Sequence, residues 1–293
     1  MNDKNIFPNH IRSYPFPKEA GDPVHVFRDW ATLKNHPEVE LAKAGDVEAA
    51  GRLIKDIISP DVGAHLRERF SGNTYFAAPM ALEASGENCI PGVLATYCAS
   101  LVGGVHAEGI YQVNKVYHTG ATAMERLLTR PSIEGDVLEN ANYVVVDDVT
   151  TLGGTIAEVA DHIQRGGGKV VGSIVLVDAS RTARIRASKK HMKIIEERFG
   201  DEIRNQFKID PSGLTDSEAT VLIAYRDVDQ LRTRIAKAER ERDQRLRSQG
   251  VRSHQQRDSD LELGAKKVKP KRSRISALKN KNKARLKDHE QER

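Results

Sequence analysis

The sequence contains few cysteines and no long apolar run, and each shortage excludes a class of protein. Two cysteines among 293 residues, Cys89 and Cys98, cannot form a disulfide framework or a zinc site by themselves, so we expect buried thiols. The least charged stretch, residues 90–105, is too short and too interrupted by proline and glycine to span a bilayer. Residues 1–10 lack the apolar run of a signal peptide. We therefore expect a cytoplasmic protein that does not enter a membrane.

Charge is unevenly distributed along the chain. The whole sequence has a net charge of +5, with 39% hydrophobic and 30% charged residues, which excludes a collagen-like or wholly disordered chain. Residues 231–293 contain 21 Lys and Arg against 9 Asp and Glu, a net charge of +12, whereas residues 1–230 have a net charge of −7. The basic character therefore belongs to the C-terminal end, and the rest of the chain is acidic.

The hydrophobic pattern divides the chain into four predicted parts. Residues 1–59 combine a proline-rich arm with helices that break at Gly45-Asp46, and we expect them to form a cap. Residues 60–180 form the predicted core, and residues 181–248 form a helical extension that ends in a charged helix from residue 228. Residues 249–293 are poor in apolar side chains and rich in Lys, Arg and Ser, so this basic tail is predicted to be disordered.

The core carries the clearest pattern of secondary structure. An all-apolar strand over 143–146 is followed by a loop over 147–155, a helix over 156–164 and a second apolar strand over 169–177. Strand, helix and strand at these lengths form a parallel βαβ unit. The pattern also predicts strand regions at 74–78 and 106–116 and a basic helix at 181–199. A short apolar run follows at 220–225. The fold class expected is α/β, with a mainly parallel central sheet flanked by helices.

The loop at the end of the first apolar strand combines acidic, hydroxyl and glycine residues. Asp147 and Asp148 stand where the strand stops, and a Thr- and Gly-rich segment leads into the helix. Amide groups at a helix N-terminus, aided by the helix dipole, bind phosphate, and threonine hydroxyls add donors. Two adjacent carboxylates repel each other unless sugar hydroxyls or a hydrated Mg²⁺ hold both. The motif therefore predicts a site for a ribose 5-phosphate.

Residues 143–155, YVVVDDVTTLGGT, resemble the phosphoribosyl pyrophosphate (PRPP) motif of the type I phosphoribosyltransferases. The spacing of residues 88–95 and 112–130 relative to this motif is most similar to the competence protein F group. The resemblance implies that Asp147 and Asp148 bind the ribose 2′- and 3′-hydroxyls and, indirectly, Mg²⁺, while the loop holds the 5′-phosphate. The PRPP-binding residues would be Asp147, Asp148, Thr150, Thr151, Leu152, Gly153, Gly154 and Thr155.

Basic residues in the segment that forms the mobile catalytic loop of this family are the catalytic candidates. They are Lys115, Arg126 and Arg130, which together with His118 of the same segment would neutralise pyrophosphate, although solvated surface charge is at least as strong an alternative. The loop over 78–87, which faces pyrophosphate in the family, contains two glutamates and no basic residue, and Leu152 stands where a small residue or threonine is usual. The zinc-binding cysteine cluster of the competence group is also absent.

Other site motifs are missing from the sequence. The glycines do not follow a strand in the G-x-G-x-x-G spacing of a dinucleotide site, and the chain has no Gly-Lys-Ser/Thr of a P-loop. The ten histidines show no metal-binding spacing, so we expect surface or packing roles for them. A βα junction without a ligand remains the structural alternative for the motif.

These patterns predict a PRPP-dependent phosphoribosyltransferase that transfers ribose 5-phosphate to an unidentified base-like acceptor and releases pyrophosphate. The alternative is a non-catalytic regulatory protein that senses PRPP or a nucleotide, and a third is a nucleic-acid-binding protein with this fold as scaffold. Acceptor selectivity in the family lies in a variable hood, expected here before residue 60 or after residue 180. The tail lacks aromatic residues, so it either contacts nucleic acid phosphates weakly and nonspecifically or serves as a solubilising extension. The helix over 228–248 is a candidate for pairing two copies in a homodimer.

Overall fold

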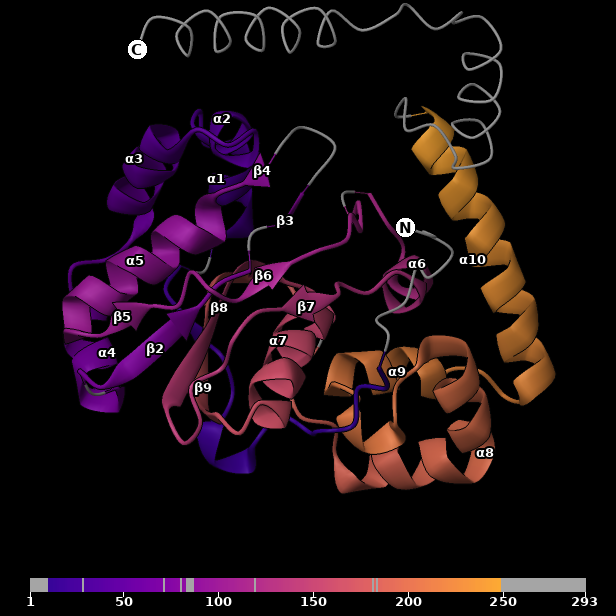
Figure 1. Ribbon diagram of the computed structural model, residues 1–293. Helices are drawn as coiled ribbons and strands as arrows, with labels where there is room; N and C mark the ends of the chain where they lie inside the picture. Colours follow the sequence, from indigo (N-terminus) through magenta and orange to yellow (C-terminus); the bar gives the residue numbers. More distant parts are fainter. Residues whose placement is uncertain are drawn as a thin grey trace, which may run out of the picture. The chain divides into compact units, whose positions relative to one another are not determined.

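The structure, a computed structural model, describes residues 10–248 except 28, 71, 80, 83–86, 119, 181 and 183. Its centre is a five-stranded parallel sheet in the order β1-β9-β8-β2-β5 (Figure 1). The strands are β1 (Val24–His25), β2 (Thr74–Ala77), β5 (Val105–His106), β8 (Asn142–Thr150) and β9 (Lys169–Asp178). Every pairing in this sheet is parallel. The predicted α/β class with a parallel central sheet is confirmed.

The two faces of the sheet bury different helices, as the alternation of β8 requires. Val144 and Val146 belong to the core on one face, with α3 (Val47–Ile57), α4 (Val62–Arg69) and α5 (Ile90–Val102). Tyr143 and Val145 point to the other face, which α7 (Gly154–Arg165) and the short 3-10 helix η1 (Lys18–Ala20) cover. Successive strand residues face opposite sides of a sheet, so the apolar run is buried on both. The carboxyl end of β8 is thereby held rigidly in the middle of the fold.

The N-terminal helices form a cap beside the carboxyl ends of the strands. Here α1 (Trp30–Asn35) and α2 (Val39–Lys43) precede α3, and Asp29 and Asp46 cap α1 and α3 through their side chains. Gly45 has a φ of 105° between α2 and α3, a conformation that glycine adopts without strain. The predicted helix break at Gly45-Asp46 is therefore present.

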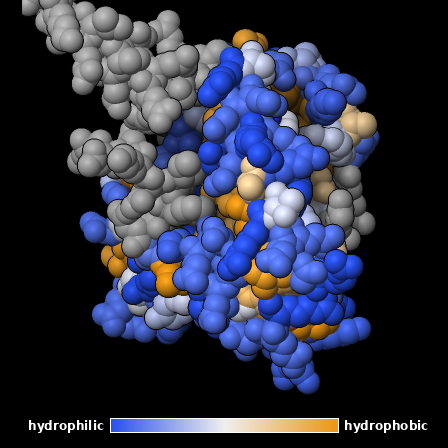
Figure 2. All heavy atoms as spheres, turned by 90° about the vertical axis from the view of Figure 1, so that its right-hand side faces the viewer, coloured by the Kyte–Doolittle hydropathy of each residue, from blue (hydrophilic) through white to orange (hydrophobic). Residues whose placement is uncertain are grey.

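A second core gathers the C-terminal helices with a short helix from the middle of the chain. It contains α6 (Ala123–Leu128), α8 (Lys189–Phe207), α9 (Asp216–Ile223) and α10 (Val228–Ser248), with the 3-10 helix η2 (Pro211–Gly213) between α8 and α9. The helix α10 contributes Leu231, Ile235 and Ala238 to this core. Figure 2 shows the side on which α8 and α10 lie in Figure 1, and its visible surface is mainly hydrophilic. The charged helix predicted from residue 228 is thus packed along an apolar stripe.

An extended arm links the two cores. Arg12 forms a parallel bridge with Ile209, and the backbone amides of Ser13 and Tyr14 both donate to Oδ1 of Asp161 in α7, each at 2.9 Å. The chain then passes through η1 to β1, which lies at the edge of the sheet beside β9. The arm therefore joins helices of the C-terminal core to the far edge of the sheet.

Several local expectations differ from the structure. The strand predicted over 143–146 continues as β8 to Thr150, so the two aspartates lie on the strand and not in a loop. The apolar run at 220–225 falls in α9 and the turn after it. The basic helix expected from residue 181 begins only at Lys189. The strand region 106–116 contains only short strands, since β6 (Tyr111–Gln112) pairs with β7 (Ile133–Glu134) outside the main sheet.

Two further expectations concern the ends of the chain and its membrane behaviour. The proline-rich arm supplies β1 to the central sheet, although the sequence pattern predicts no strand before residue 60. No helix among the described residues is long and apolar enough to cross a membrane. The basic tail predicted to be disordered lies outside the described residues.

Candidate functional site

The two adjacent aspartates lie at the carboxyl end of β8, where both side chains are half-buried. The backbone amide of Asp148 donates to Oδ1 of Asp147 at 2.9 Å, and the amide of Val149 donates to Oδ1 of Asp148 at 2.7 Å. The side-chain amide of Asn88 donates to Oδ2 of Asp148 at 2.8 Å. Asn88 ends β4 (Glu87–Asn88), which pairs with β3 (Ala81–Leu82) beside the cap. The carboxylates are therefore oriented by backbone and amide donors, and each carboxylate has the capacity to accept further hydrogen bonds from a ligand.

Asp147 carries a strongly perturbed carboxyl group. Burial raises the pKa of Asp147 well above its usual value, and repulsion from the Asp148 carboxylate adds to this rise. A carboxylate in this environment gains free energy from any ligand that supplies hydrogen-bond donors or positive charge. The pair is thus suited to accept a diol together with a cation.

The loop after β8 presents a helix N-terminus to the same place. Gly153 caps α7 with a φ of 75°, and a Cβ there would stand 2.4 Å from Cδ1 of Ile185. Because glycine has no side chain to cap the helix, the first amides of α7 are left for an anion. The loop itself is fixed by the hydroxyl of Thr215, which donates to the carbonyl of Leu152. The turn before α7 therefore requires glycine, and the amides that it leaves open are suited to an anion.

Carboxylates and helix N-terminus open on one cavity of about 500 Å³. All eight residues predicted to bind PRPP line it: Asp147, Asp148, Thr150, Thr151, Leu152, Gly153, Gly154 and Thr155. Another part of the wall comes from the N-terminal helices and includes Trp30, Leu33, Lys34, Val39, Glu40 and Lys43. The structure thus brings together every residue of the predicted binding motif, although PRPP binding itself stays a prediction.

The three catalytic candidates occupy different environments. Lys115 is exposed and does not line this cavity. Arg126 lines it, and its guanidinium donates to the carbonyls of His118 at 2.9 Å and Ala121 at 3.3 Å. Arg130 also borders the cavity but is only 1% exposed, because its side chain is paired with Glu158. Of the three candidates, Arg126 is thus the one best placed to contact a ligand in the cavity, whereas Arg130 is engaged in a buried ion pair with Glu158.

His118, which comes from the same segment as the catalytic candidates, also lines the cavity. Its Nε2 donates to the carbonyl of Thr129 at 2.7 Å, and burial lowers its pKa to about 4. The ring is therefore neutral at physiological pH, with Nδ1 as the acceptor nitrogen. The residue before it, Tyr117, has a φ of 49°, and Arg245 of α10 donates to the Tyr117 carbonyl at 2.9 Å. The extension thus holds the backbone of the segment beside the cavity.

Two further buried residues, Arg12 and Glu218, lie behind the loop between β8 and α7, residues 151–153, and no site motif in the sequence points to them. This loop is called the phosphate loop below because the adjacent helix N-terminus is proposed to bind phosphate. Glu218 is the N3 residue of α9 and lines the cavity at 2% exposure. Arg12, at 0% exposure, pairs with Glu218 and with Glu158 of α7. The capping sequence Thr215-x-x-Glu218 would have indicated a helix start there, but it carries no hint of the arginine.

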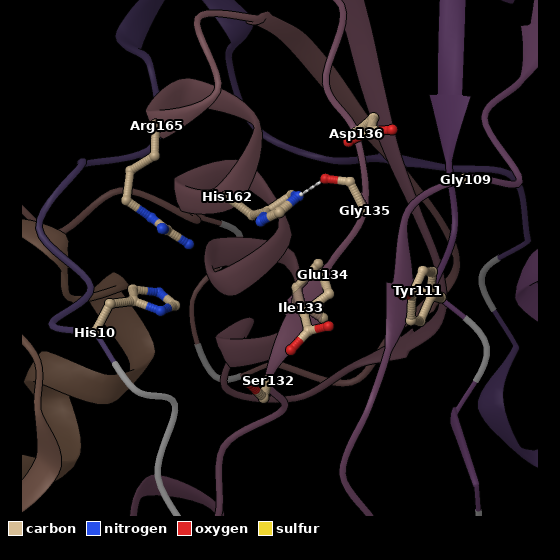
Figure 3. Close-up of a pocket in the computed structure, with 10 residues that line it drawn as sticks. All are labelled: His10, Gly109, Tyr111, Ser132, Ile133, Glu134, Gly135, Asp136, His162 and Arg165. Carbon is tan, nitrogen blue, oxygen red and sulfur yellow. Dashed lines mark hydrogen bonds between the residues drawn. The ribbon is translucent and has the colours of Figure 1, made fainter.

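A second cavity lies apart from this site. It has a volume of about 590 Å³ and contains none of the predicted site residues. Figure 3 shows its lining, where His162 donates from Nε2 to the carbonyl of Gly135 at 2.9 Å. The side chains around it mix acidic and basic groups: His10, Tyr111, Glu134, Asp136, His162 and Arg165. This mixture indicates no single ligand chemistry, so the cavity at the end of β8 is the candidate site.

Comparison with known proteins finds similarity in the part of the chain that contains the candidate site. Residues 100–210 match the sequence model of the family described as Phosphoribosyl transferase domain. The chain is 36% identical to Protein TraN of Escherichia coli over 218 residues, which cover 73% of this chain and 49% of TraN. It is 32% identical to an uncharacterized protein of Haemophilus influenzae over 139 residues, 47% of this chain and 31% of that protein.

A shorter part of the chain is similar to a named enzyme. The chain is 42% identical to Orotate phosphoribosyltransferase of Methanosphaera stadtmanae over 55 residues, which cover 19% of this chain and 31% of that enzyme. The chain therefore spans about half the length of TraN and about a third of the other two relatives. The segment that matches the family model, residues 100–210, contains β8, the loop after it, α7 and β9. Residues 100–210 are thus similar to phosphoribosyltransferases, and the parallel sheet flanked by helices is consistent with the α/β fold of that family.

Proposed function

We propose that the protein is a PRPP-dependent phosphoribosyltransferase that transfers ribose 5-phosphate to a base-like acceptor and releases pyrophosphate. The observation that supports this most directly is the meeting of a carboxylate pair and an open helix N-terminus on one cavity, at the end of β8. Asp147 and Asp148 would accept hydrogen bonds from the ribose hydroxyls, and the first amides of α7 would bind the 5′-phosphate. Ribose 5-phosphate is then held at both ends.

The site also fits Mg²⁺ held mainly by substrate oxygens. Among the described residues no group of three or more His, Cys, Asp or Glu side chains forms a protein metal cage. Mg²⁺ is commonly bound by one or two carboxylates together with water and substrate phosphates, which matches the pair at Asp147 and Asp148. When bound with PRPP, the ion supplies charge neutralisation for the leaving pyrophosphate. The protein's own contribution is to position the ribose and to exclude water.

In this reaction the bond between C1 of the ribose and the pyrophosphate oxygen breaks, and a bond from C1 to the acceptor forms. The anomeric carbon develops positive charge, so orientation of the ribose and stabilisation of the leaving group carry most of the catalysis. Arg126 is the described lining cation nearest to a catalytic role, and its guanidinium would have to exchange its loop carbonyls for pyrophosphate oxygens. Lys115 would need a movement of its segment to reach the cavity.

The acceptor would enter between the cap and the end of β8. Trp30 is 42% exposed and lies on this wall with Lys34 and Lys43, so the wall offers an aromatic surface and positive charge. The orotate phosphoribosyltransferase match makes orotate a reasonable first acceptor to test, beside purine and pyrimidine bases. The hood expected before residue 60 would correspond to α1 and α2.

A second candidate is a regulatory protein that binds PRPP or a nucleotide without turnover. It is favoured by the position of Lys115 away from the cavity and by the engagement of Arg126 with backbone carbonyls. The similarity to the competence protein F group stays a prediction. The division of the chain into arm and cap, core, extension and tail, with boundaries after residues 59, 180 and 248, also stays a prediction.

Calorimetric titration of the full chain with PRPP and Mg²⁺ tests the proposal, followed by measurement of pyrophosphate release with each acceptor. We expect PRPP to bind, and the double variant Asp147→Ala/Asp148→Ala to abolish binding while the protein stays folded. Asp201→Asn, on the exposed face of α8, is the matched control and should bind as the wild type does. Binding without pyrophosphate release for any acceptor would favour the regulatory candidate, and equal PRPP affinity in the double variant would contradict the site.

A further inference from the structure

A carboxylate lies directly behind the helix N-terminus that is proposed to bind phosphate. Glu218 of α9 lines the cavity together with Gly153, Gly154 and Thr155. Its Oε1 is 3.1 Å from the position that a Cβ on Gly154 would take. An ionised side chain there repels a phosphate dianion, because the low dielectric of a buried site strengthens Coulomb interactions. The site therefore needs a compensating positive charge.

Glu218 is kept at this place by the helix that it starts. Its Oε2 accepts the backbone amide of Thr215 at 2.9 Å, and the Thr215 hydroxyl accepts the Glu218 amide at 3.0 Å, which completes a capping box. The same Thr215 hydroxyl donates to the carbonyl of Leu152 in the phosphate loop. The carboxylate is thus a consequence of how α9 begins and supports the loop.

Arg12 of the arm compensates this charge. Its Nη2 donates to Oε2 of Glu218, its Nη1 donates to Oε1 of Glu158 at 3.1 Å, and Nη1 also reaches the carbonyl of Gly154 at 3.4 Å. Burial lowers the pKa of Arg12, but the two glutamates more than offset this and leave the pKa above its ordinary value. The guanidinium therefore stays charged and contacts the phosphate loop from behind.

The cluster as a whole is electrically balanced. Arg12 and Arg130 face Glu158 and Glu218, and all four side chains are at most 2% exposed. The adjacent Asp161 pairs with Arg165 at 2.9 Å and with His10 at 3.2 Å. Burial alone would raise the pKa of Asp161, but the hydrogen bonds from His10, the arm amides and Arg165 lower it to about 2. Loss of Arg12 would leave one unbalanced negative charge behind the phosphate loop. Loss of Glu218 would leave one unbalanced positive charge there.

We propose that Arg12 is a positioning residue for phosphate binding, which cancels the Glu218 carboxylate behind α7 and holds the Gly154 carbonyl so that the helix N-terminus attracts the 5′-phosphate. This inference rests on the proposed function, because it assumes that a phosphate binds at α7. It assigns a binding role to the arm, which lies outside the segment that matches the phosphoribosyl transferase family. The arm residue acts through Glu218 and Gly154 and does not touch the ligand itself.

Calorimetric titration of the full chain with PRPP and with ribose 5-phosphate, at low and at moderate salt, tests this proposal. The variants are Arg12→Met, Arg12→Lys, Glu218→Gln and the double variant Arg12→Met/Glu218→Gln. Glutamine at N3 preserves the capping box, so Glu218→Gln changes mainly the charge. Glu202→Gln is the matched control, since Glu202 is also buried and paired with an arginine, Arg232, at 2.8 Å in the extension.

We expect Arg12→Met to weaken binding of both ligands at least tenfold, and Arg12→Lys to retain most of the affinity because it keeps the charge. Glu218→Gln should bind at least as tightly as the wild type, and the double variant should recover most of the affinity lost in Arg12→Met. Glu202→Gln should bind as the wild type does. Melting temperatures measured in parallel separate loss of binding from loss of fold, and Glu218→Gln still decides the matter if Arg12→Met does not fold.

Different results would overturn different claims. Wild-type binding combined with weaker binding in Glu218→Gln, or with no recovery in a folded double variant, would overturn the role of Arg12 alone. A wild-type protein that binds neither PRPP nor ribose 5-phosphate would overturn the proposed function and this inference together. Equal affinities in Arg12→Met and the wild type would also overturn the inference while leaving the proposed function intact.

Discussion

The Asn88 side-chain amide donates to Oδ2 of Asp148 across 60 positions of sequence, and this contact joins the small hairpin beside the cap to the end of the central strand. The Oδ1 atom of Asn88 accepts a hydrogen bond from the backbone amide of Ile90, at the start of α5, at 3.2 Å. One side chain therefore orients an acidic ligand-binding group and supports a helix end. The two roles use different atoms, so they can be separated by substitution.

Replacement of Asn88 by aspartate should weaken PRPP binding by about tenfold or more. The aspartate keeps an acceptor for Ile90 but replaces the donor to Asp148 with a like charge, and a hydrogen bond to a charged group contributes roughly 1.5–3 kcal/mol. Titration calorimetry measures the change. Ser100→Ala, which removes an exposed hydrogen bond on α5, is the control. Wild-type affinity in Asn88→Asp would show that the contact does not prepare the site.

Replacement of Asp147 by asparagine should remove PRPP binding and yet raise the melting temperature at neutral pH. Because burial and Asp148 raise the pKa of Asp147 in the folded protein, the ionised form costs stability above that raised pKa. The cost disappears as the pH falls below the unfolded value of about 3.9. The variant and the wild type should therefore differ in melting temperature at pH 8 and converge near pH 4. A destabilised Asp147→Asn protein at pH 8 would contradict this account.

Replacement of Gly153 by alanine should destabilise the protein by about 1–3 kcal/mol and weaken phosphate binding. The residue has a positive φ, and the added Cβ would meet Ile185 at 2.4 Å. Gly51→Ala is a matched control, because a Cβ on Gly51 in the middle of α3 meets nothing within 4 Å. That control should stabilise the protein by about 0.5–1 kcal/mol through helix propensity. Urea denaturation measures both changes.

Replacement of Asp161 by alanine should cost about 2–3 kcal/mol of stability at pH 7, since Asp161 accepts both arm amides and pairs with Arg165. Burial alone would raise the pKa of Asp161, but the hydrogen bonds from His10 and the arm lower it to about 2. Its stabilising contribution is therefore present above the unfolded value and is lost as the pH falls toward 2. The difference between variant and wild type should shrink over that window in acid denaturation curves.

Deletion of residues 249–293 should leave PRPP affinity unchanged and abolish any retardation of DNA or RNA in a low-salt gel. The tail carries lysines and arginines without aromatic residues, so nucleic acid contact would be to phosphates and would weaken steeply with salt. Intact protein that does not retard nucleic acid at low salt would leave the solubilising role.

The parts that the sequence predicted well are those that depend on neighbouring residues. The apolar strand, the aspartates and the glycines at the start of α7 lie within 13 consecutive positions, and the residues from Asp147 to Thr155 all line one cavity. The loss of a separate loop at 147–150 is a matter of how far β8 pairs with β9, since Val149 and Thr150 align with Val177 and Asp178. The extent of this pairing depends on the neighbouring strand, so the local hydrophobic pattern cannot predict it.

Residues whose roles depend on distant partners were missed. The strand β1 is only two residues long and follows Pro23, so its pairing with β9 has no local periodicity to indicate it. The run at 220–225 is recognised in the sequence only as apolar, and the Thr215–Glu218 capping box starts the helix that contains its first part. Arg12 shows no motif at all, because its partners come from two helices far along the chain.

The arm also imposes an order on how the protein reaches its native state. Arg12 is synthesised near the start of the chain, and its partner Glu218 follows 206 positions later. Contacts of such high sequence separation form slowly, since a long loop must close before they contribute. The sheet can pair before α9 exists, but the balanced charges behind the phosphate loop cannot. Binding competence should therefore appear late in refolding, after the parallel sheet has formed.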